Sequence, residues 1–296
     1  MQLFANASNV IVMNKIHFLV SMAAALLPFS AAKSEEPFEI DIVSFNIRYL
    51  TSADKGDRHW NTRKHLVAET VQQFNADIIG IQEAFDSQLK FVLEKNPGFA
   101  MTGVGRDNGK TRGEYSAILF RKDRFELDPN EHGTFWLSDT PEKAASKSWG
   151  NNVVRICTWA RLIEKETKRG FYVFNTHFDH QSQNSREQAV RLIARRIADR
   201  KSKDPIVLTG DFNAGETNPA ILYLKRERFV DTFRTMHPET KDALTLHWWK
   251  GDKPGTKIDY VFVQPGTKVL DASIDRFHKG EFYPSDHYPV RARLQF

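Results

Sequence analysis

Cysteine is nearly absent from this sequence: Cys157 stands alone among 296 residues. A chain with one cysteine cannot close an internal disulfide, but a domain of this length buries enough apolar surface to fold without one. Cys157 lies in the apolar run VVRICTWARLI, which predicts a small buried hydrophobe. The sequence after residue 32 also lacks an Asn-x-Ser/Thr glycosylation acceptor. Both absences are typical of a bacterial exported protein.

Long apolar runs are absent as well, except near the N-terminus. The basic start MNK at 13–15 precedes FLVSMAAALLPF at 18–29, and the small residues SAA follow at 30–32. This order predicts a signal peptide over residues 1–32 and therefore an exported protein, periplasmic or secreted, with no stable membrane insertion after cleavage. An uncleaved N-terminal anchor is the alternative, although the apolar stretch is short for a membrane span.

The sequence also has no large excess of positive or negative residues. The chain has 42 Lys and Arg against 37 Asp and Glu, a net charge of +5. This mild bias suits a phosphate-bearing substrate but is well short of a protein that coats nucleic acid. No His-x-x-x-His or cysteine-rich spacing indicates a zinc site. Because repeats, low-complexity tracts and linkers are also absent, we expect one domain over residues 37–296, and a monomer.

What is present is an alternation of strand and helix patterns. Apolar runs rich in β-branched residues predict strands, and apolar residues at helical spacing predict helices. The predicted strands are 38–47, 77–83, 114–121, 205–211, 257–264 and 288–296, with a hairpin over 155–178. The predicted helices are 60–75, 86–96 and 185–201. Many strands with fewer helices fit two packed sheets covered by helices.

Polar residues collect where these apolar strands end. Taken singly, each is explained as well by a turn, a cap or a structural histidine. In GDFN at 210–213, Asp211 and Asn213 share one face if the chain stays extended, while Phe212 turns into the core. The full set, in chain order, is Asn46, Gln82-Glu83, Asn175-Thr176-His177, Gly210-Asp211-Phe212-Asn213, Ile258-Asp259-Tyr260 and Ser285-Asp286-His287.

This ordered set resembles the endonuclease/exonuclease/phosphatase superfamily over about residues 40–294. That superfamily includes deoxyribonuclease I, abasic-site endonucleases, sphingomyelinases, inositol-polyphosphate phosphatases and mRNA deadenylases. The resemblance implies a four-layer α/β/β/α sandwich with two packed mixed β-sheets. It also implies an enzyme, a metal-dependent phosphoester hydrolase whose site lies where the strand ends meet.

The resemblance implies a divalent cation, Mg²⁺ or Mn²⁺, because the ligands are oxygen atoms. Glu83 is the expected main ligand, with Asn46 close by. Asp286 is either a second ligand or a residue that orients the phosphate site, and one-metal and two-metal schemes both stay open. Gly210 is expected to let the substrate phosphate approach the backbone.

The resemblance also implies a role for each catalytic candidate. Asp211 orients or deprotonates the attacking water, and Asn213 donates a hydrogen bond to a phosphate oxygen. His177 and His287 contact the phosphate from either side. Asp259 is expected to pair with one of these two histidines, with His287 favoured, fixing its tautomer and raising its pKa.

Four further residues are candidates for substrate binding: Arg155, Arg112, His247 and Trp248. Arg155 stands where nucleases of the superfamily carry a phosphate-contacting arginine, and a plain surface ion pair is the alternative. Arg112 and Glu114 precede a strand that borders the site in relatives, and His180 is expected behind the catalytic residues. Of Trp248 and Trp249, one is expected to be exposed and to stack on a base or sugar, unless both anchor the loop.

The arginine-rich face of the helix predicted at 185–201 has two explanations. It steers polyanions towards the protein, or it is a solvated helix face of the ordinary kind. The arginines are Arg186, Arg191, Arg195, Arg196 and Arg200.

The predicted function is a phosphodiesterase or nuclease that acts on nucleic acid or nucleotides by metal-assisted in-line attack of water. The alternative is a phospholipid or sugar-phosphate hydrolase, similar to a sphingomyelinase or an inositol phosphatase. A sphingomyelinase-like enzyme usually carries an exposed apolar hairpin, and the sequence shows no such run. A non-catalytic binding protein on this fold would have lost a motif residue, and none is lost.

Overall fold

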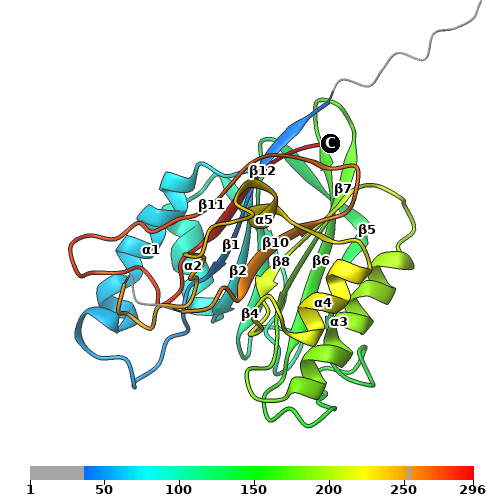
Figure 1. Ribbon diagram of the computed structural model, residues 1–296. Helices are drawn as coiled ribbons and strands as arrows, with labels where there is room; N and C mark the ends of the chain where they lie inside the picture. The colour runs from blue at the N-terminus through cyan, green and yellow to red at the C-terminus, as the bar shows by residue number, and fades with distance from the viewer. Residues whose placement is uncertain (1–36, 252–254) are drawn as a thin grey trace, which may run out of the picture. The chain divides into compact units, whose positions relative to one another are not determined.

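Two six-stranded β-sheets lie face to face in the computed structural model, which describes residues 37–251 and 255–296 (Figure 1). The predicted signal peptide, residues 1–32, lies outside the described residues. The strands are β1 (Glu39–Asn46), β2 (Ile78–Ala84), β3 (Phe99–Thr102), β4 (Tyr115–Arg121), β5 (Phe125–Trp136), β6 (Ile156–Glu164), β7 (Gly170–His177), β8 (Ile206–Asp211), β9 (Val230–Asp231), β10 (Asp259–Val263), β11 (Lys268–Ile274) and β12 (Val290–Gln295). The helices are the 3₁₀ turn η1 (Gly56–Arg58), α1 (Trp60–Phe74), α2 (Asp86–Lys95), α3 (Gln183–Ala198), α4 (Pro219–Arg226) and α5 (Thr232–Met236).

Both sheets are mixed. The first sheet has the order β11-β12-β1-β2-β4-β3 and the second β5-β6-β7-β8-β10-β9. β1 and β2 are parallel, as are β7 and β8, whereas pairs such as β1–β12 and β8–β10 are antiparallel. The predicted sandwich of two mixed sheets is therefore confirmed.

The central strands are buried on both faces, which explains their continuous apolar sequences. In β1, Ile40 and Ile42 point between the sheets, where they join Val173 and Val207 of the second sheet. The alternating residues Val43 and Phe45 point the other way, onto the helices. The period-two alternation of a strand thus supplies two separate cores.

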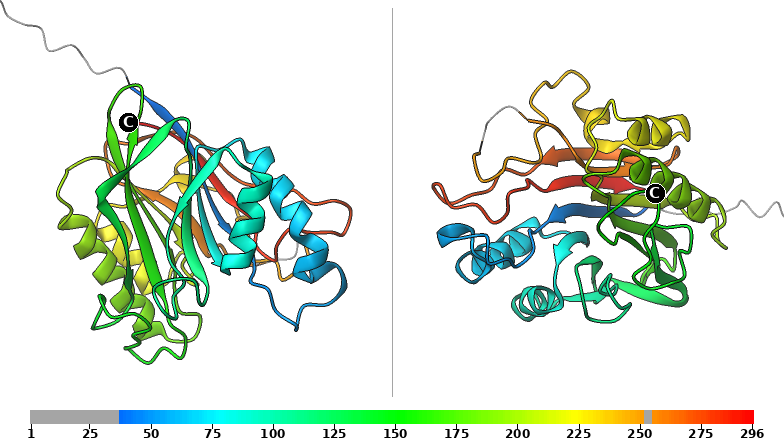
Figure 2. Two further views of the ribbon diagram at one scale, coloured as in Figure 1. Left: turned by 180° about the vertical axis from the view of Figure 1, so that it is seen from behind. Right: turned by 90° about the horizontal axis from the view of Figure 1, so that it is seen from below.

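Helices cover the two outer faces. The apolar side of α1, with Val67 and Val71, packs on the first sheet. On the second sheet, α3 packs through residues such as Ala189 and Ile193, and α4 packs beside it through residues such as Leu224. Figure 2 shows α1 and α2 on one side of the sheets and α3 and α4 on the other, which completes the four layers. Within the described residues, no helix is both long and apolar enough to cross a membrane.

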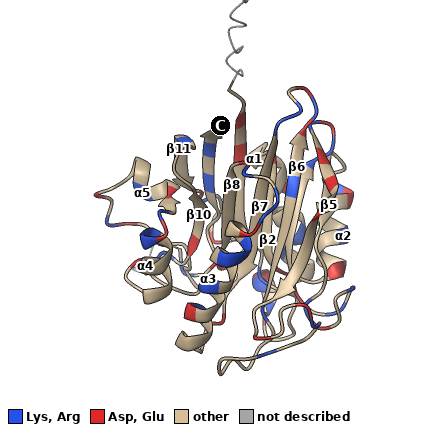
Figure 3. Ribbon diagram, turned by 90° about the vertical axis from the view of Figure 1, so that its right-hand side faces the viewer, with Lys and Arg blue, Asp and Glu red and all other residues tan. Residues whose placement is uncertain are grey.

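The arginines of α3 lie against the domain's own aromatic rings. Basic residues mark the outer side of this helix in Figure 3. The guanidinium of Arg191 lies 4.9 Å from the ring centre of Tyr223, and that of Arg196 lies 5.2 Å from the ring centre of Phe135. These contacts favour a packed, partly solvated helix face over a surface kept free for polyanions.

Candidate active site

The ends of the central strands meet at one edge of the sandwich. β7 and β8 end at His177 and Asp211, which are neighbours in register. β10 runs antiparallel to β8 and places Asp259 opposite Asp211. A cavity of about 490 Å³ opens at this edge. Its lining residues are Arg48, Tyr49, Glu83, Arg106, Glu114, Val153, Arg155, His177, His180, Asp211, Asn213, Leu246, Trp248, Asp286 and His287.

Glu83 enters the pocket through a β-bulge. The pairing of β2 with β4 shifts register between Gln82 and Ala84, and Glu83 adopts φ 65°, a conformation rare for a side chain of this kind. The side chain of Gln82 instead runs between the sheets, where its amide donates to the side-chain oxygen of Asn175 at 2.7 Å. Strain of this type persists where the surrounding structure holds it and is common at functional sites.

Asp211 and Asn213 converge through a turn, not through strand alternation. β8 ends at Asp211, and Asn213 has φ 46°, so the predicted extended geometry is wrong at this point. The backbone N–H of Asn213 donates to Oδ1 of Asp211 at 2.9 Å, and its side-chain amide donates to the carbonyl of Phe178 at 3.0 Å. Phe212 is buried in the core, as the sequence predicts. The turn therefore points both polar side chains at the pocket.

Gly210 allows β7 and β8 to pack closely, because it has no side chain between them. A Cβ atom at this position would lie 2.5 Å from the carbonyl oxygen of Thr176 on β7. The sequence-based idea that Gly210 makes room for the substrate phosphate is thus corrected, because the space it leaves is filled by the neighbouring strand.

Asp259 and His287 form the predicted pair. Oδ2 of Asp259 lies 2.9 Å from Nδ1 of His287, and both side chains are buried. Burial opposes a charge on His287, but the Asp259 carboxylate outweighs this effect and raises the pKa of His287 to about 10. His287 is therefore a cation at neutral pH, and its Nε2 lies 3.8 Å from Oδ2 of Asp211.

His177 has the opposite charge state. Arg155 lies 2.9 Å from its Nδ1, and the side-chain amide nitrogen of Asn213 lies 3.0 Å from its Nε2, so both ring nitrogens face hydrogen-bond donors. Burial and the positive charge of Arg155 lower the pKa of His177 well below its usual 6.5. Nε2 lies 3.4 Å from Oδ2 of Asp211. The neutral ring of His177 therefore lies beside that carboxylate, between two hydrogen-bond donors.

Arg155 is buried inside the site, so its alternative explanation as a surface ion pair is wrong. It also lies 3.2 Å from Nδ1 of His180, which is exposed at the pocket, and 3.7 Å from Glu114. Glu114 in turn pairs with Arg106 at 2.7 Å. Burial raises the pKa of Glu114 to about 7, against the pull of Arg106. Sequence reasoning missed Arg106, because it lies in a loop with several other cationic residues.

Two predicted substrate-binding residues do not reach the pocket. Arg112 is exposed, and its guanidinium lies 3.5 Å from the carbonyl of Asp107 in its own loop. His247 is buried, with its ring 4.1 Å from that of Tyr288. Trp248 does line the pocket and is 58% exposed, so it is the exposed member of the tryptophan pair. Arg48, which sequence reasoning also missed, lines the wall beside Glu83.

The sequence matches the endonuclease/exonuclease/phosphatase family over residues 43–287, which is most of the chain. The chain belongs to this family. The match includes all the motif residues from Asn46 to His287, and the arrangement of their strand ends around one pocket agrees with it.

Solved structures of this family are similar to the chain over nearly their whole length. An endonuclease/exonuclease/phosphatase family protein from Bacteroides thetaiotaomicron is 32% identical, with a TM-score of 0.80 over 88% of this chain and 99% of that protein. A mannosyl-6-phosphatase from Bacteroides thetaiotaomicron is also 32% identical, with a TM-score of 0.78 over 87% of this chain and 100% of that protein. An uncharacterized protein of Acanthamoeba polyphaga mimivirus is 27% identical over 259 residues, 78% of this chain and 90% of the viral protein.

The donor set of this family member fits a divalent cation. Glu83, Asp211 and Asp286 all line one pocket. Burial, with the Asp259 carboxylate adding to it, raises the pKa of Asp211 to about 7, and burial raises the pKa of Asp286 as well. In both residues burial disfavours the ionised carboxylate, and a cation bound beside them would stabilise that ionised form.

Two groups of side chains bring ligand atoms close together within residues 37–251 and 255–296. One is Glu83 with His177 and Asp211, and the other is Asp211 with Asp259 and His287. The predicted ligand Asp286 belongs to neither group. The amide nitrogen of Asn46 donates to Glu83 at 3.1 Å and to Asp211 at 2.9 Å. Asn46 is therefore placed to orient the two carboxylates.

Proposed function

We propose that this chain is a divalent-cation-dependent phosphoester hydrolase whose substrate is a sugar phosphate. The reaction class is inferred from one observation: carboxylates and a buried histidine cation face the same pocket. Glu83, Asp211 and Asp286 supply the acidic side, and His287 with Arg155 supplies the cationic side. The cationic side would contact the phosphoryl oxygens directly, and the acidic side would hold a divalent cation that contacts them from the other direction.

Each side chain has a defined part in this reaction. A pKa of about 7 suits Asp211 to accept a proton from the attacking water near neutral pH. His287, as a cation, donates from Nε2 to a phosphoryl oxygen, and Asp259 holds the ring in place through Nδ1. The neutral ring of His177, held between Arg155 and Asn213, lies beside Asp211. Glu83 would be the main protein ligand of a divalent cation, which would offset charge on the phosphoryl oxygens.

The sugar-phosphate assignment is supported by the mannosyl-6-phosphatase from Bacteroides thetaiotaomicron. Its 32% identity extends over 87% of this chain. The small net charge of +5 agrees with a small anionic substrate and does not require a polyanion. The proposal therefore takes the sugar-phosphate alternative in place of nucleic acid.

A nucleotide or nucleic acid is the second candidate, and Trp248 favours it. This side chain is 58% exposed on the pocket wall. An exposed indole next to a phosphate site stacks on a base as readily as on a sugar.

A substrate panel tests both candidates. The chain without residues 1–32 is assayed with Mg²⁺ or Mn²⁺ on hexose 6-phosphates, nucleoside monophosphates, DNA, RNA, inositol phosphates and sphingomyelin, with EDTA as the metal-free control. We expect the highest kcat/KM for a hexose 6-phosphate and no activity in EDTA. A higher kcat/KM for nucleotides or nucleic acid, lost in Trp248→Ala, would move the assignment to the second candidate.

Three predictions from the sequence extend this proposal and are tested separately. They are export after removal of residues 1–32, a periplasmic or secreted location, and a monomeric state. Cell fractionation and N-terminal sequencing test the first two, and light scattering of the purified protein tests the third.

A further inference from the structure

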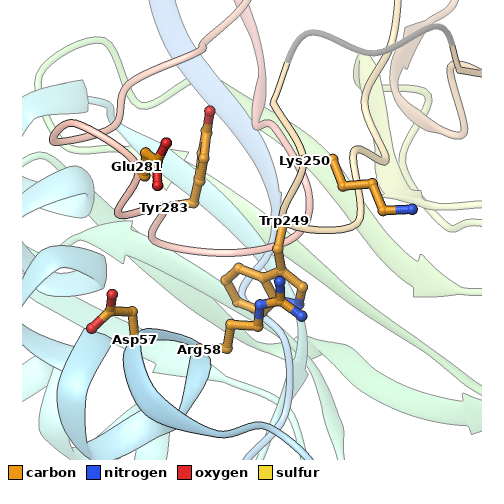
Figure 4. A pocket seen from close by; sticks show the side chains of 6 residues that line it. All are labelled: Asp57, Arg58, Trp249, Lys250, Glu281 and Tyr283. Carbon is orange, nitrogen blue, oxygen red and sulfur yellow. The ribbon is translucent and has the colours of Figure 1, made fainter.

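A second pocket adjoins the active pocket across a pair of tryptophans. Trp248 lines the active pocket, whereas Trp249 lines a separate cavity of about 370 Å³. Both have positive φ, 51° and 61°, which is unusual for so large a side chain. The two cavities share no lining residue among those the structure describes, and the peptide bond between Trp248 and Trp249 joins their walls, since consecutive Cα atoms are about 3.8 Å apart. The other lining residues of the second cavity are Asp57, Arg58, Lys250, Glu281 and Tyr283 (Figure 4).

The two aromatic rings of this second pocket are held in place by packing. The ring of Tyr283 lies 4.7 Å from that of His247 and 4.8 Å from that of His278. A side chain at Gly251 would meet the Tyr283 hydroxyl at 2.4 Å, so the backbone also lies close to this ring. Such restraint lowers the entropy lost when a ligand binds to the ring.

Trp249 rests on a buried arginine. The guanidinium of Arg63 lies 5.4 Å from the indole centre. Arg63 is itself fixed by donating to the carbonyls of Ile47, Arg48, Arg58 and Pro284 at 2.6–2.9 Å. The indole is half-buried, and Figure 4 shows it among the other lining side chains of the pocket.

The charged side chains that line the second pocket have no net charge. Asp57 and Glu281 oppose Arg58 and Lys250, all four are exposed, and no ion pair joins them within the described residues. A net positive lining would be needed for a second phosphate or for a nucleic acid strand. Free donors and acceptors around fixed aromatic rings instead suit a neutral ligand with many hydroxyl groups, which stacks its C–H face and hydrogen-bonds at its rim.

We propose that the second pocket binds a neutral sugar residue linked to the sugar whose phosphate is cleaved. The substrate is then a phosphorylated oligosaccharide that extends past Trp248 to Trp249. This inference rests on the proposed function for the position of the phosphate. It adds a subsite that lies outside the catalytic pocket and that determines substrate length.

Kinetics with substrates of two lengths test the subsite. We expect kcat/KM for a disaccharide 6-phosphate to exceed that for the matching hexose 6-phosphate by about threefold to tenfold, through a lower KM, which is the effect of one aromatic stacking contact. Trp249→Ala and, separately, Glu281→Gln should reduce the disaccharide value to that of the hexose. Both should leave hydrolysis of the hexose 6-phosphate unchanged. Glu227→Gln, an exposed glutamate at the end of α4, is the matched control.

A binding measurement separates this inference from the proposed function. The unphosphorylated disaccharide is titrated into the wild-type protein and into Trp249→Ala, and binding is followed by saturation-transfer NMR. Saturable binding that Trp249→Ala removes supports the subsite, even if no phosphoester is hydrolysed. Equal kcat/KM for the two substrate lengths together with no saturable binding would overturn it, even if the hydrolase is active. A Trp249-dependent advantage seen with dinucleotides and not with disaccharides would overturn the sugar assignment.

Discussion

At the residue scale, two histidines of one pocket have opposite charges because their partners differ. His287 faces the carboxylate of Asp259 at 2.9 Å and has its pKa raised to about 10. His177 faces the guanidinium of Arg155 at 2.9 Å and is kept neutral. The sequence motifs predict both histidines and the Asp259 partner of His287, whereas the contact of Arg155 with His177 is visible only in the structure. Pairs of titratable groups that are pushed apart in this way are typical of acid–base sites.

The variant Asp259→Asn tests the charge on His287. Without this carboxylate, burial is opposed only by the charges of Asp211 and Asp286, and the pKa of His287 falls from about 10. Because the protonated ring is the active form, loss of activity on the alkaline side should begin at a lower pH in the variant. At pH 8 we expect kcat to drop about 100-fold. The measurement is kcat/KM from pH 5 to pH 10, with Asp123→Asn as an exposed control, and an unchanged alkaline limb would count against the role of Asp259.

At the element scale, the sequence predicts the central strands well and the peripheral elements poorly. β1, β2, β7 and β8 are buried on both faces, and their apolar runs are unmistakable. β5 and β11 escaped prediction because each mixes polar and apolar residues and contains an irregular register. The short α4 and α5 were missed as well, since eight and five residues carry little periodicity.

The candidate site was likewise predicted only in part from the sequence. Residues at strand ends were predicted, because a polar residue after an apolar run is visible in the sequence. The bulge at Glu83, the turn at Asn213 and the inward-facing Arg106 were not, because they depend on contacts between distant segments. Arg112 and His247 were placed wrongly for the same reason: a residue near a motif need not face the pocket.

Gly210→Ala tests the packing role of this glycine. The added methyl group would meet the Thr176 carbonyl at 2.5 Å and force β7 and β8 apart. We expect the free energy of unfolding to fall by about 1–3 kcal/mol. Gly98→Ala is the control, because its nearest neighbour is the flexible end of Arg121 and the change should be within about 1 kcal/mol of zero. Urea denaturation measures both, and equal stability of Gly210→Ala and wild type would refute the explanation.

A buried ion pair at the start of α5 allows a second stability test. Nζ of Lys257 lies 2.5 Å from Oδ2 of Asp231, and both side chains are buried. Lys257→Met would leave the carboxylate unpaired and should cost about 3–5 kcal/mol of unfolding free energy. The double variant Lys257→Met/Asp231→Asn should recover most of this loss, because asparagine still caps α5. A double variant no more stable than the single one, by urea denaturation, would contradict this account.

At the scale of the whole domain, the site lies on the seam between the two sheets. Asn46 and Glu83 come from the first sheet, and His177, Asp211 and Asp259 come from the second. The predicted sandwich explains this arrangement, because two packed sheets with parallel central strands bring strand ends to one edge. The pocket therefore forms only when the two sheets pack together, and a cation bound there should link residues of both sheets.

Cation binding should accordingly raise the melting temperature. Saturating Mn²⁺ at about 100 times its dissociation constant would add about 2.7 kcal/mol of stability. In the folded protein the pKa of Asp211 is raised to about 7. Below that pH, protons compete with the cation for the carboxylate. Above it, the carboxylate is ionised and buried, so a cation stabilises it most. The thermal shift should therefore be larger at pH 8 than at pH 5 and should shrink in Asp211→Asn. A shift that is equal at both pH values and in both proteins would argue against this site.

The most direct test of the central claim is the rate of phosphate release from a hexose 6-phosphate as Mg²⁺ or Mn²⁺ is titrated into wild type and Asp211→Asn. The account predicts no release in EDTA, a saturable rise with cation in wild type, and a loss of about 100-fold or more in Asp211→Asn at saturating cation. A wild-type rate that persists in EDTA, or full activity in Asp211→Asn, would contradict metal-assisted hydrolysis at this seam.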